Sequence, residues 1–295
     1  MNGIFNVLKP PGMTSHDVVD EVRKIIGQRR IGHAGTLDPA AAGVLPVLCG
    51  QAARLAEFLI EKDKAYRVEM VLGVVASTQD LTVPPDRVVD ASGLSLAEVE
   101  RAARSFVGEI DQVVPAFSAV QVEGRRLYRM AQRGKGIPVI KRQVRVISLE
   151  ILSMSHGPNP RVLMDVTCSK GTYVRTLCHD IGEKLGPGGA LGFLLRTRSG
   201  PFRLEDSVTL QELASSPEAA LLPLLSALEG CPSAALQPRA ARLLHTGIKP
   251  FPADFVSMPE AREGETLAIL GPGDELIAIG VLSGGRVSIR KVFSE

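Results

Sequence analysis

The sequence predicts an α+β fold that ends in a small β-rich appendage. Segments with the alternation of a β-strand and segments with the spacing of an amphipathic helix interleave along the chain. Connections of hairpin length recur and no βαβ series is sustained, which favours α+β over a doubly wound parallel sheet. With 295 residues, the chain can bury a sizeable core in one large domain or two unequal ones.

The N-terminal elements are a short strand and a helix. Residues 4–8 are apolar and end at a Lys-Pro-Pro-Gly turn. A helix opens at residues 14–15, because apolar residues follow at helical spacing up to Gly27, which is a suitable C-terminal glycine. The glycine-rich residues 28–43 are expected to be irregular, and Asp38 is held in a loop because proline follows it.

The middle of the chain adds two strands and two helices. Alternating apolar residues predict strands over residues 66–72 and 162–168. A Ser-x-x-Glu capping box at residues 95–98 opens a helix. A second amphipathic helix follows Gly171 and stops at Gly186.

The C-terminal part has the pattern of a separate unit. A turn-rich stretch at residues 230–233 predicts a linker. Beyond it lie a helix candidate over residues 238–244 and strands around 265–271, 275–282 and 286–292. An appendage of about 60 residues is near the lower limit for an independent core.

Composition excludes several classes of protein. The 34 basic residues nearly balance the 32 acidic ones, so net charge identifies no partner. The four cysteines contain no Cys-x-x-Cys pair, which argues against a zinc ribbon or a disulfide framework. We find no basic secretory leader and no run of 18 apolar residues, so we expect a cytoplasmic protein that does not cross a membrane.

Two loops could carry chemistry. His33 and Asp38 lie in a six-residue span of a glycine-punctuated loop, which lets a backbone approach a ligand closely. The alternative is an ordinary turn in which Asp38 accepts backbone hydrogen bonds. Further on, Tyr173 and Arg175 follow a strand and open a helix, where backbone amides and Lys170 could hold a phosphate. The alternative there is a packed tyrosine and a surface ion pair.

A strongly basic segment covers residues 121–147. One acidic residue, Glu123, stands among eight basic ones: Arg125, Arg126, Arg129, Arg133, Lys135, Lys141, Arg142 and Arg145. Such a block indicates a surface that tracks phosphates, although a solvated basic face would look the same. Arg196, Arg198 and Arg203 extend the theme. These patterns indicate a nucleic-acid binder with an acidic active site and do not define a reaction.

Taken in order, the motifs resemble the TruB family of tRNA pseudouridine synthases. The resemblance covers roughly residues 2–203 and rests on KPPGMTS (9–15), GHAGTLDPAAAGVLP (32–46), KAYRVEMVLG (64–73), the SA…G…LY pattern from Ser118 to Tyr128, and CSKGTYVRTLCHDIGEKLG (168–186). Two departures concern segments that we expect to be peripheral. Ser77-Thr78-Gln79-Asp80 stands where the family usually has Thr-Asp-Thr-x-Asp, and Gln121 replaces a common lysine.

The resemblance implies a fold, a substrate and a reaction. The implied fold is a mixed, mostly antiparallel sheet flanked by helices, with a catalytic domain over residues 1–232, an RNA-gripping insertion at about 114–145, and a PUA-like RNA-binding barrel over 233–295. The implied reaction isomerises the T-arm uridine at position 55 of tRNA to pseudouridine after the base is flipped out. No redox chemistry is needed, so no cofactor or metal is expected, and no obligate protein partner either.

The resemblance also implies roles for single residues. Asp38, ionised at neutral pH, would act on the sugar as nucleophile or base. His33 would fill the space that the base leaves, and Tyr66 would stack on the flipped ring and assist the final deprotonation. Arg175 would pair with Asp38 in a dry pocket whose wall includes Tyr173 and Leu195. The RNA backbone would be held by basic residues: Arg125, Arg126, Arg129, Arg133, Lys141 and Arg142.

The sequence leaves other functions open. The chain could be a tRNA-folding chaperone whose binding role outweighs catalysis. A guide-RNA-dependent synthase shares the catalytic loop, but the compact appendage without a lysine-rich tail favours the stand-alone kind. A glycoside hydrolase would need a second carboxylate across the bond, whereas Asp38 is the only acid in its motif.

Overall fold

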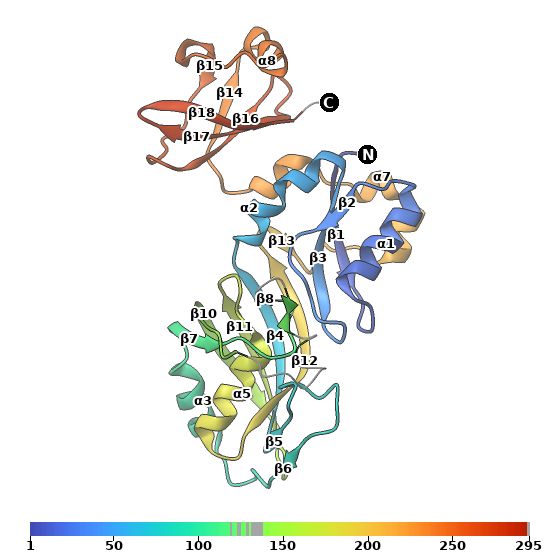
Figure 1. The fold of residues 1–295 in the computed structure, drawn as a ribbon, viewed down its shortest axis with the longest axis vertical. Helices are drawn as coiled ribbons and strands as arrows, with labels where there is room; N and C mark the ends of the chain where they lie inside the picture. The colour runs from blue at the N-terminus through green and yellow to red at the C-terminus, as the bar shows by residue number, and fades with distance from the viewer. Residues whose placement is uncertain (119, 123–124, 128–129, 131–137, 294–295) are drawn as a thin grey trace.

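The computed structural model describes residues 1–118, 120–122, 125–127, 130 and 138–293. It shows a large sheet with helices packed on it and a smaller C-terminal sheet at one end (Figure 1). The predicted α+β class is confirmed. In the part of the chain that is described, no helix is long and apolar enough to cross a membrane.

The large sheet has nine strands among the described residues, and its main path runs β1-β3-β12-β4-β11-β10-β7. The strands on this path are β1 (Gly3–Lys9), β3 (Ala42–Cys49), β12 (Gly189–Ser199), β4 (Lys64–Leu72), β11 (Arg161–Cys168), β10 (Lys141–Met154) and β7 (Gly108–Val113). Two short strands, β2 (Ile31–His33) and β13 (Phe202–Arg203), pair with β3 and β12. All the pairings are antiparallel except that of β3 with β12. This parallel contact joins the two halves of the sheet.

The first helix, α1 (Ser15–Ile26), forms where the sequence predicted it. Thr14 caps its N-terminus in a reciprocal capping box, and Gly27 ends it with a φ of 63°. Its buried valines pack against β1 and β3 in one core cluster. The segment after α1 is less irregular than expected, because β2 pairs with the end of β3.

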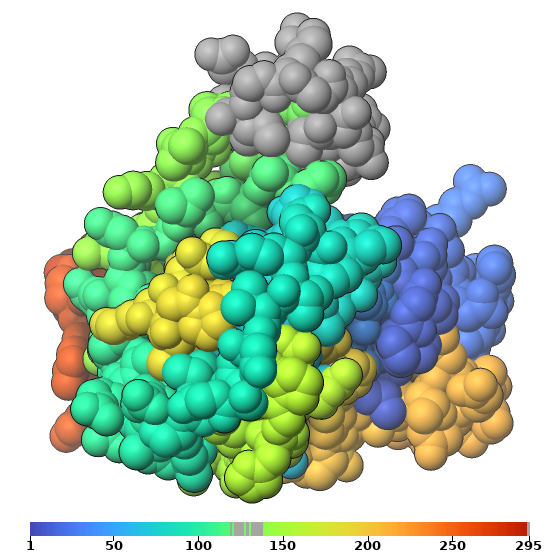
Figure 2. All heavy atoms as spheres, turned by 90° about the horizontal axis from the view of Figure 1, so that it is seen from below, coloured from blue at the N-terminus to red at the C-terminus, as the bar shows by residue number. Residues whose placement is uncertain are grey.

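Two further helices, α3 (Leu96–Arg104) and α5 (Val174–Leu185), pack on the other half of the sheet (Figure 1). Ser95 caps α3 in the predicted capping box. Apolar side chains of both helices join those of β4, β11 and β12 in the largest core cluster. Figure 2 shows the underside of the molecule, where the segment between β4 and α3, in cyan to teal, covers much of the surface beside α5, in yellow.

The smaller sheet follows the order β15-β14-β16-β17-β18. Its elements are β14 (Ser233–Leu236), α8 (Pro238–His245), β15 (Phe255–Ser257), β16 (Thr266–Leu270), β17 (Leu276–Ser283) and β18 (Arg286–Val292). The predicted helix and the last three strands are therefore confirmed to within about one residue. Arg54 donates to the Val292 carbonyl and Lys291 to the Arg54 carbonyl, so this sheet is attached to the segment after β3.

The remaining elements are short. They are η1 (Gly50–Leu55), α2 (Ala56–Ile60), β5 (Val74–Val75), β6 (Arg87–Val88), β8 (Gln121–Val122), β9 (Arg125–Arg126), α6 (Leu210–Ser215), α7 (Pro217–Ala220), η2 (Leu224–Leu228) and η3 (Pro252–Asp254). Of these, α2 borders the site through its last residue, Ile60.

Candidate active site

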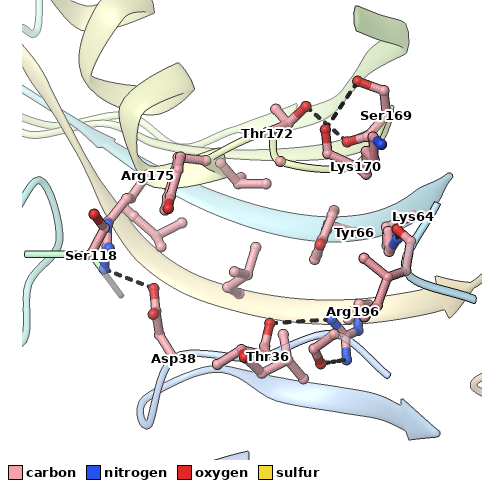
Figure 3. A pocket seen from close by; sticks show the side chains of 18 of the residues that line it. Thr36, Asp38, Lys64, Tyr66, Ser118, Ser169, Lys170, Thr172, Arg175 and Arg196 are labelled. Atoms are coloured by element: carbon pink, nitrogen blue, oxygen red, sulfur yellow. Dashed lines mark hydrogen bonds and ion pairs between the residues drawn. The ribbon is translucent and has the colours of Figure 1, made fainter. Parts of the chain in front are cut away.

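A cavity of about 370 Å³ opens between the loop after β2, the centre of the sheet, and the turn that joins β11 to α5 (Figure 3). Asp38 comes from the loop, Tyr66 from β4, and Tyr173 and Arg175 from the start of α5. These four predicted residues come together although 137 positions separate Asp38 from Arg175. A cavity of this size lies within the range of sites for small organic groups.

The loop that carries Asp38 is held in place by a buried lysine. The fully buried Lys9 donates hydrogen bonds from Nζ to the carbonyls of Pro10, Pro39 and Ala41, at 2.9, 3.1 and 2.6 Å. Burial lowers the pKa of Lys9 to about 8, and the nearby charge of Asp38 opposes this shift. The lysine therefore fixes the backbone that directly follows the aspartate and ties it to the turn at Pro10.

Arg175 forms an ion pair with the Asp38 carboxylate. Its Nη1 lies 2.8 Å from Asp38 Oδ2, and its Nη2 donates to the Phe117 carbonyl at 2.7 Å. The predicted ion pair is thus confirmed. Arg175 has 7% of its side chain exposed and Asp38 has 46%, so the carboxylate lines the cavity but solvent reaches it. The expectation of a dry pocket around Asp38 is wrong for this reason.

A second carboxylate lies beside the pair. Asp80 Oδ2 is 3.8 Å from Arg175 Nη1, and the Asp80 side chain is 13% exposed. The hydroxyls of Thr78 and Thr82 donate to Asp80 Oδ1 and fix it in its turn. The segment that departs from the family pattern is therefore part of the site, contrary to our expectation that it is peripheral. The sequence signal was available, since Asp80 is the acid that this segment retains.

Tyr66 lies opposite a buried positive charge on β12. Arg196, which we expected on a basic surface, is fully buried and lines the cavity. It donates to the carbonyls of Val44 at 2.7 Å and Gly35 at 3.1 Å. It also donates to the carbonyl of Thr36 at 3.4 Å (Figure 3). Burial raises the pKa of the Tyr66 phenol, whereas the charge and hydrogen bonding of Arg196 lower it.

Tyr173 is held in the cavity wall by its backbone. Its N–H donates to Gln112 Oε1 at 2.7 Å, and its carbonyl accepts from Gln112 Nε2 at 3.0 Å. Its ring lies against Arg175, with 5.7 Å between the guanidinium carbon and the ring centroid.

Two predicted residues lie outside the cavity lining. The prediction for Leu195 is wrong by one position, because side chains alternate along β12 and it is Leu194 and Arg196 that face the cavity. His33 ends β2 and is not among the residues that line the cavity. Burial, followed by the charge of Arg196, lowers the pKa of His33.

The basic segment is described only in part. Lys141 and Arg142 are exposed on β10, while Arg125 and Arg126 form β9. Arg129 and Arg133 lie outside the described residues, so their predicted contacts stay predictions. Within the described ranges, no group of three or more His, Cys, Asp or Glu residues could hold a metal ion.

Comparisons with known proteins agree with the motifs. The N-terminal domain model of the TruB family of pseudouridylate synthases matches residues 23–174, and the C-terminal domain model of tRNA pseudouridylate synthase B matches residues 175–229. The second match ends before β14, so the smaller sheet lies beyond both models.

Relatives match over most of their length. The tRNA pseudouridine synthase B of Pelotomaculum thermopropionicum is 43% identical over 95% of this chain and 90% of its own. That of Symbiobacterium thermophilum is 49% identical over 85% of this chain and 83% of its own.

Two solved structures share the fold. An H/ACA RNP bound to a substrate RNA containing 2′-deoxyuridine has a TM-score of 0.77 at 28% identity, and a Cbf5-Nop10-Gar1 complex has 0.76 at 30%. Each match covers 99% of this chain and 85% of the other. The chain belongs to the TruB family of pseudouridylate synthases.

Proposed function

We propose that this protein isomerises a uridine in the T-arm loop of tRNA, at position 55, to pseudouridine. The observation that carries the proposal is the carboxylate of Asp38, held by Arg175 at a cavity that Tyr66 and Tyr173 also line. Relatives named tRNA pseudouridine synthase B support tRNA as the substrate.

The chemistry needs one reactive carboxylate and a place for the detached base. The bond between the sugar and a ring nitrogen breaks, and a bond between the same sugar carbon and C5 of the base forms. Asp38 acts at the sugar, and Arg175 fixes the rotamer from which it does so. The uridine is flipped out of the T-loop to reach the cavity, where Tyr66 stacks on its ring.

RNA binding is assigned to two surfaces. The exposed Lys141 and Arg142 support the assignment of residues 114–145 as the RNA-gripping insertion. The smaller sheet, from Ser233 onward, would act as a PUA-like RNA-binding domain. The higher identity to the named tRNA enzymes than to the Cbf5 complex supports a stand-alone cytoplasmic enzyme without a guide RNA or an obligate protein partner.

The test compares wild type with Asp38→Asn on a T-arm stem-loop that carries 5-tritiated uridine. Tritium release measures product, because C5 loses its hydrogen when it bonds to the sugar. We expect Asp38→Asn to bind the RNA within several-fold of wild type and to release no tritium, because its shape is retained and its charge is lost.

The matched control is Asp165→Asn. Asp165 is also paired with an arginine on the sheet, Arg67, but it does not line the cavity, so this variant should retain activity. A wild-type protein that binds the stem-loop and releases no tritium would be a chaperone, and the enzymatic proposal would be refuted. Loss of binding in parallel with turnover would make Asp38 structural.

A further inference from the structure

Arg196 is a buried cation without an anionic partner. Its side chain is about 1% exposed, and it forms no ion pair with a carboxylate in the described part of the chain. Its hydrogen bonds to backbone go to neutral carbonyls on β3 and on the loop before Asp38. A buried charge of this kind is costly unless something nearby carries or develops negative charge.

The register of the sheet places this charge beside Tyr66. Arg196 on β12 and Tyr66 on β4 are direct partners in the antiparallel ladder, and both line the cavity. Side chains at such a pair have Cβ atoms about 5 Å apart. The juxtaposition is therefore set by backbone pairing and does not depend on a flexible loop.

The backbone under Arg196 is itself fixed by a close approach of β3. Gly43, the parallel partner of Arg196, has a φ of 114°, and a Cβ there would lie 2.2 Å from the Arg196 carbonyl oxygen. Only glycine fits this position, and its close backbone contact with Arg196 fixes the spacing of β3 and β12 there.

Groups from every neighbouring element act on the Tyr66 phenol. Arg196 faces it from β12, the Cys168 thiol from β11 and Asp38 from the loop, while Lys64 lies two residues earlier on β4 and is bonded to carbonyls at the end of α2. Burial raises the phenol pKa most, Cys168 and Asp38 raise it further, and Arg196 alone among these lowers it. Lys64 loses charge readily, because burial and Arg196 lower its pKa to about 8.

We propose that Arg196 is a positioning residue that holds the Tyr66 oxygen and supplies the positive charge beside it while Tyr66 exchanges a proton with the uracil ring. This inference rests on the proposed function. Tyr66 gives its phenolic proton to the ring nitrogen released from the sugar, and the resulting phenolate takes the proton from C5. The electron pair of the broken C–H bond restores the ring double bond. One proton has moved from carbon to nitrogen, and no proton or electron is gained or lost overall.

A purely structural arginine would behave differently. Its loss would loosen the Gly35–Thr36 backbone and slow every step that depends on Asp38. Loss of an arginine that acts through Tyr66 would instead slow the proton transfer from C5 in particular. Deuterium at C5 distinguishes the two roles, because only a step that breaks this bond is sensitive to it.

The experiment measures single-turnover product formation on stem-loops with uridine or 5-deuterouridine, for wild type, Arg196→Gln and Arg196→Lys. We expect Arg196→Gln to slow product formation by about 10²-fold, the lower end of what a positioned general base contributes. Its deuterium isotope effect should exceed that of wild type. Arg196→Lys keeps a charge without the planar fork, so its isotope effect should lie between the two.

Arg198→Gln is the control, since Arg198 lies on the same strand and donates to the Gly200 carbonyl outside the cavity. Its isotope effect should equal that of wild type. Circular dichroism shows whether each variant folds. If Arg196→Gln does not fold, the isotope effect of Arg196→Lys is compared with that of wild type instead. An isotope effect equal to wild type in a folded Arg196 variant overturns the inference, whatever its rate. Absence of product from wild type instead refutes the proposed function, so the two failures are distinguishable.

Discussion

Replacing Arg175 by lysine separates the geometry of the guanidinium from its charge. Arg175 donates to Asp38 from Nη1 and to the Phe117 carbonyl from Nη2, so it fixes the carboxylate relative to the segment before residue 119. A lysine ammonium is a single point of charge and cannot make both contacts in the same plane. The variant should therefore fold and keep its charge while Asp38 loses its preferred rotamer.

The size of the effect follows from the hydrogen bond and its exposure. A hydrogen bond to a charged group contributes about 1.5–3 kcal/mol. Because the Asp38 side chain is 46% exposed, solvent replaces part of this interaction, which leaves about 1–2 kcal/mol. If this appears in the transition state, the rate falls by about 5- to 30-fold, at 1.36 kcal/mol for each factor of ten.

The assay is single-turnover tritium release from the T-arm stem-loop, with RNA affinity measured separately. Arg67→Lys is the matched control, because Arg67 makes a two-point ion pair with Asp165 at 2.9 and 2.8 Å on the same sheet and does not line the cavity. A wild-type rate for Arg175→Lys would remove Arg175 from the proposed site. An equal loss in the Arg67 variant would show that the effect is not local.

The remaining predictions concern the loop, the sheet and the basic segment. The pKa of Lys9 is lowered from 10.5 to about 8 in the folded protein, so between these two pH values the unfolded chain binds more protons than the folded one. Wild type should therefore gain stability relative to Lys9→Met as the pH rises through this window, and thermal unfolding of the two proteins measures this. If wild type instead lost stability relative to Lys9→Met over this pH range, the result would contradict the lowered pKa of Lys9. Gly43→Ala should lower the melting temperature far more than Gly27→Ala, which places its Cβ in open space, and equal shifts would argue against the close approach. Lys141→Glu with Arg142→Glu should flatten the salt dependence of RNA binding, by about one unit of slope for each phosphate that the protein no longer neutralises, and an unchanged slope would leave β10 without a role in binding.

Local signals predicted the elements whose ends are chemically marked. The helices α1 and α3 begin at capping boxes, and glycine-containing turns at residues 271–273 and 284–285 separate β16, β17 and β18. Each of these elements could therefore be located without knowledge of its partners. The parallel pairing of β3 with β12 could not be predicted in this way. It joins residues about 150 positions apart, as Gly43 and Arg196 illustrate, and nothing in either segment specifies the other.

The same limit explains which site residues were found. The motif identified Asp38 and Arg175, and the structure brings them into contact. The sequence places Lys9 in a turn and in the KPPGMTS motif without predicting its burial, and it predicts Arg196 only as surface charge. The burial of a charged side chain depends on carbonyls supplied from elsewhere in the fold. Leu195 was placed one residue away from the cavity, since the face of a strand is fixed by its pairing.

The two arginines of the cavity are not interchangeable, and their surroundings show why. Arg175 has carboxylates at 2.8 and 3.8 Å, from Asp38 and Asp80, so its charge is already balanced and it acts by orientation. Arg196 donates to carbonyls and not to carboxylates, so no acid balances its charge, and in our proposal this charge stabilises the negative charge that develops on Tyr66. The division follows from the fold, because Arg175 lies in the first turn of α5 while Arg196 lies on β12, inside the sheet.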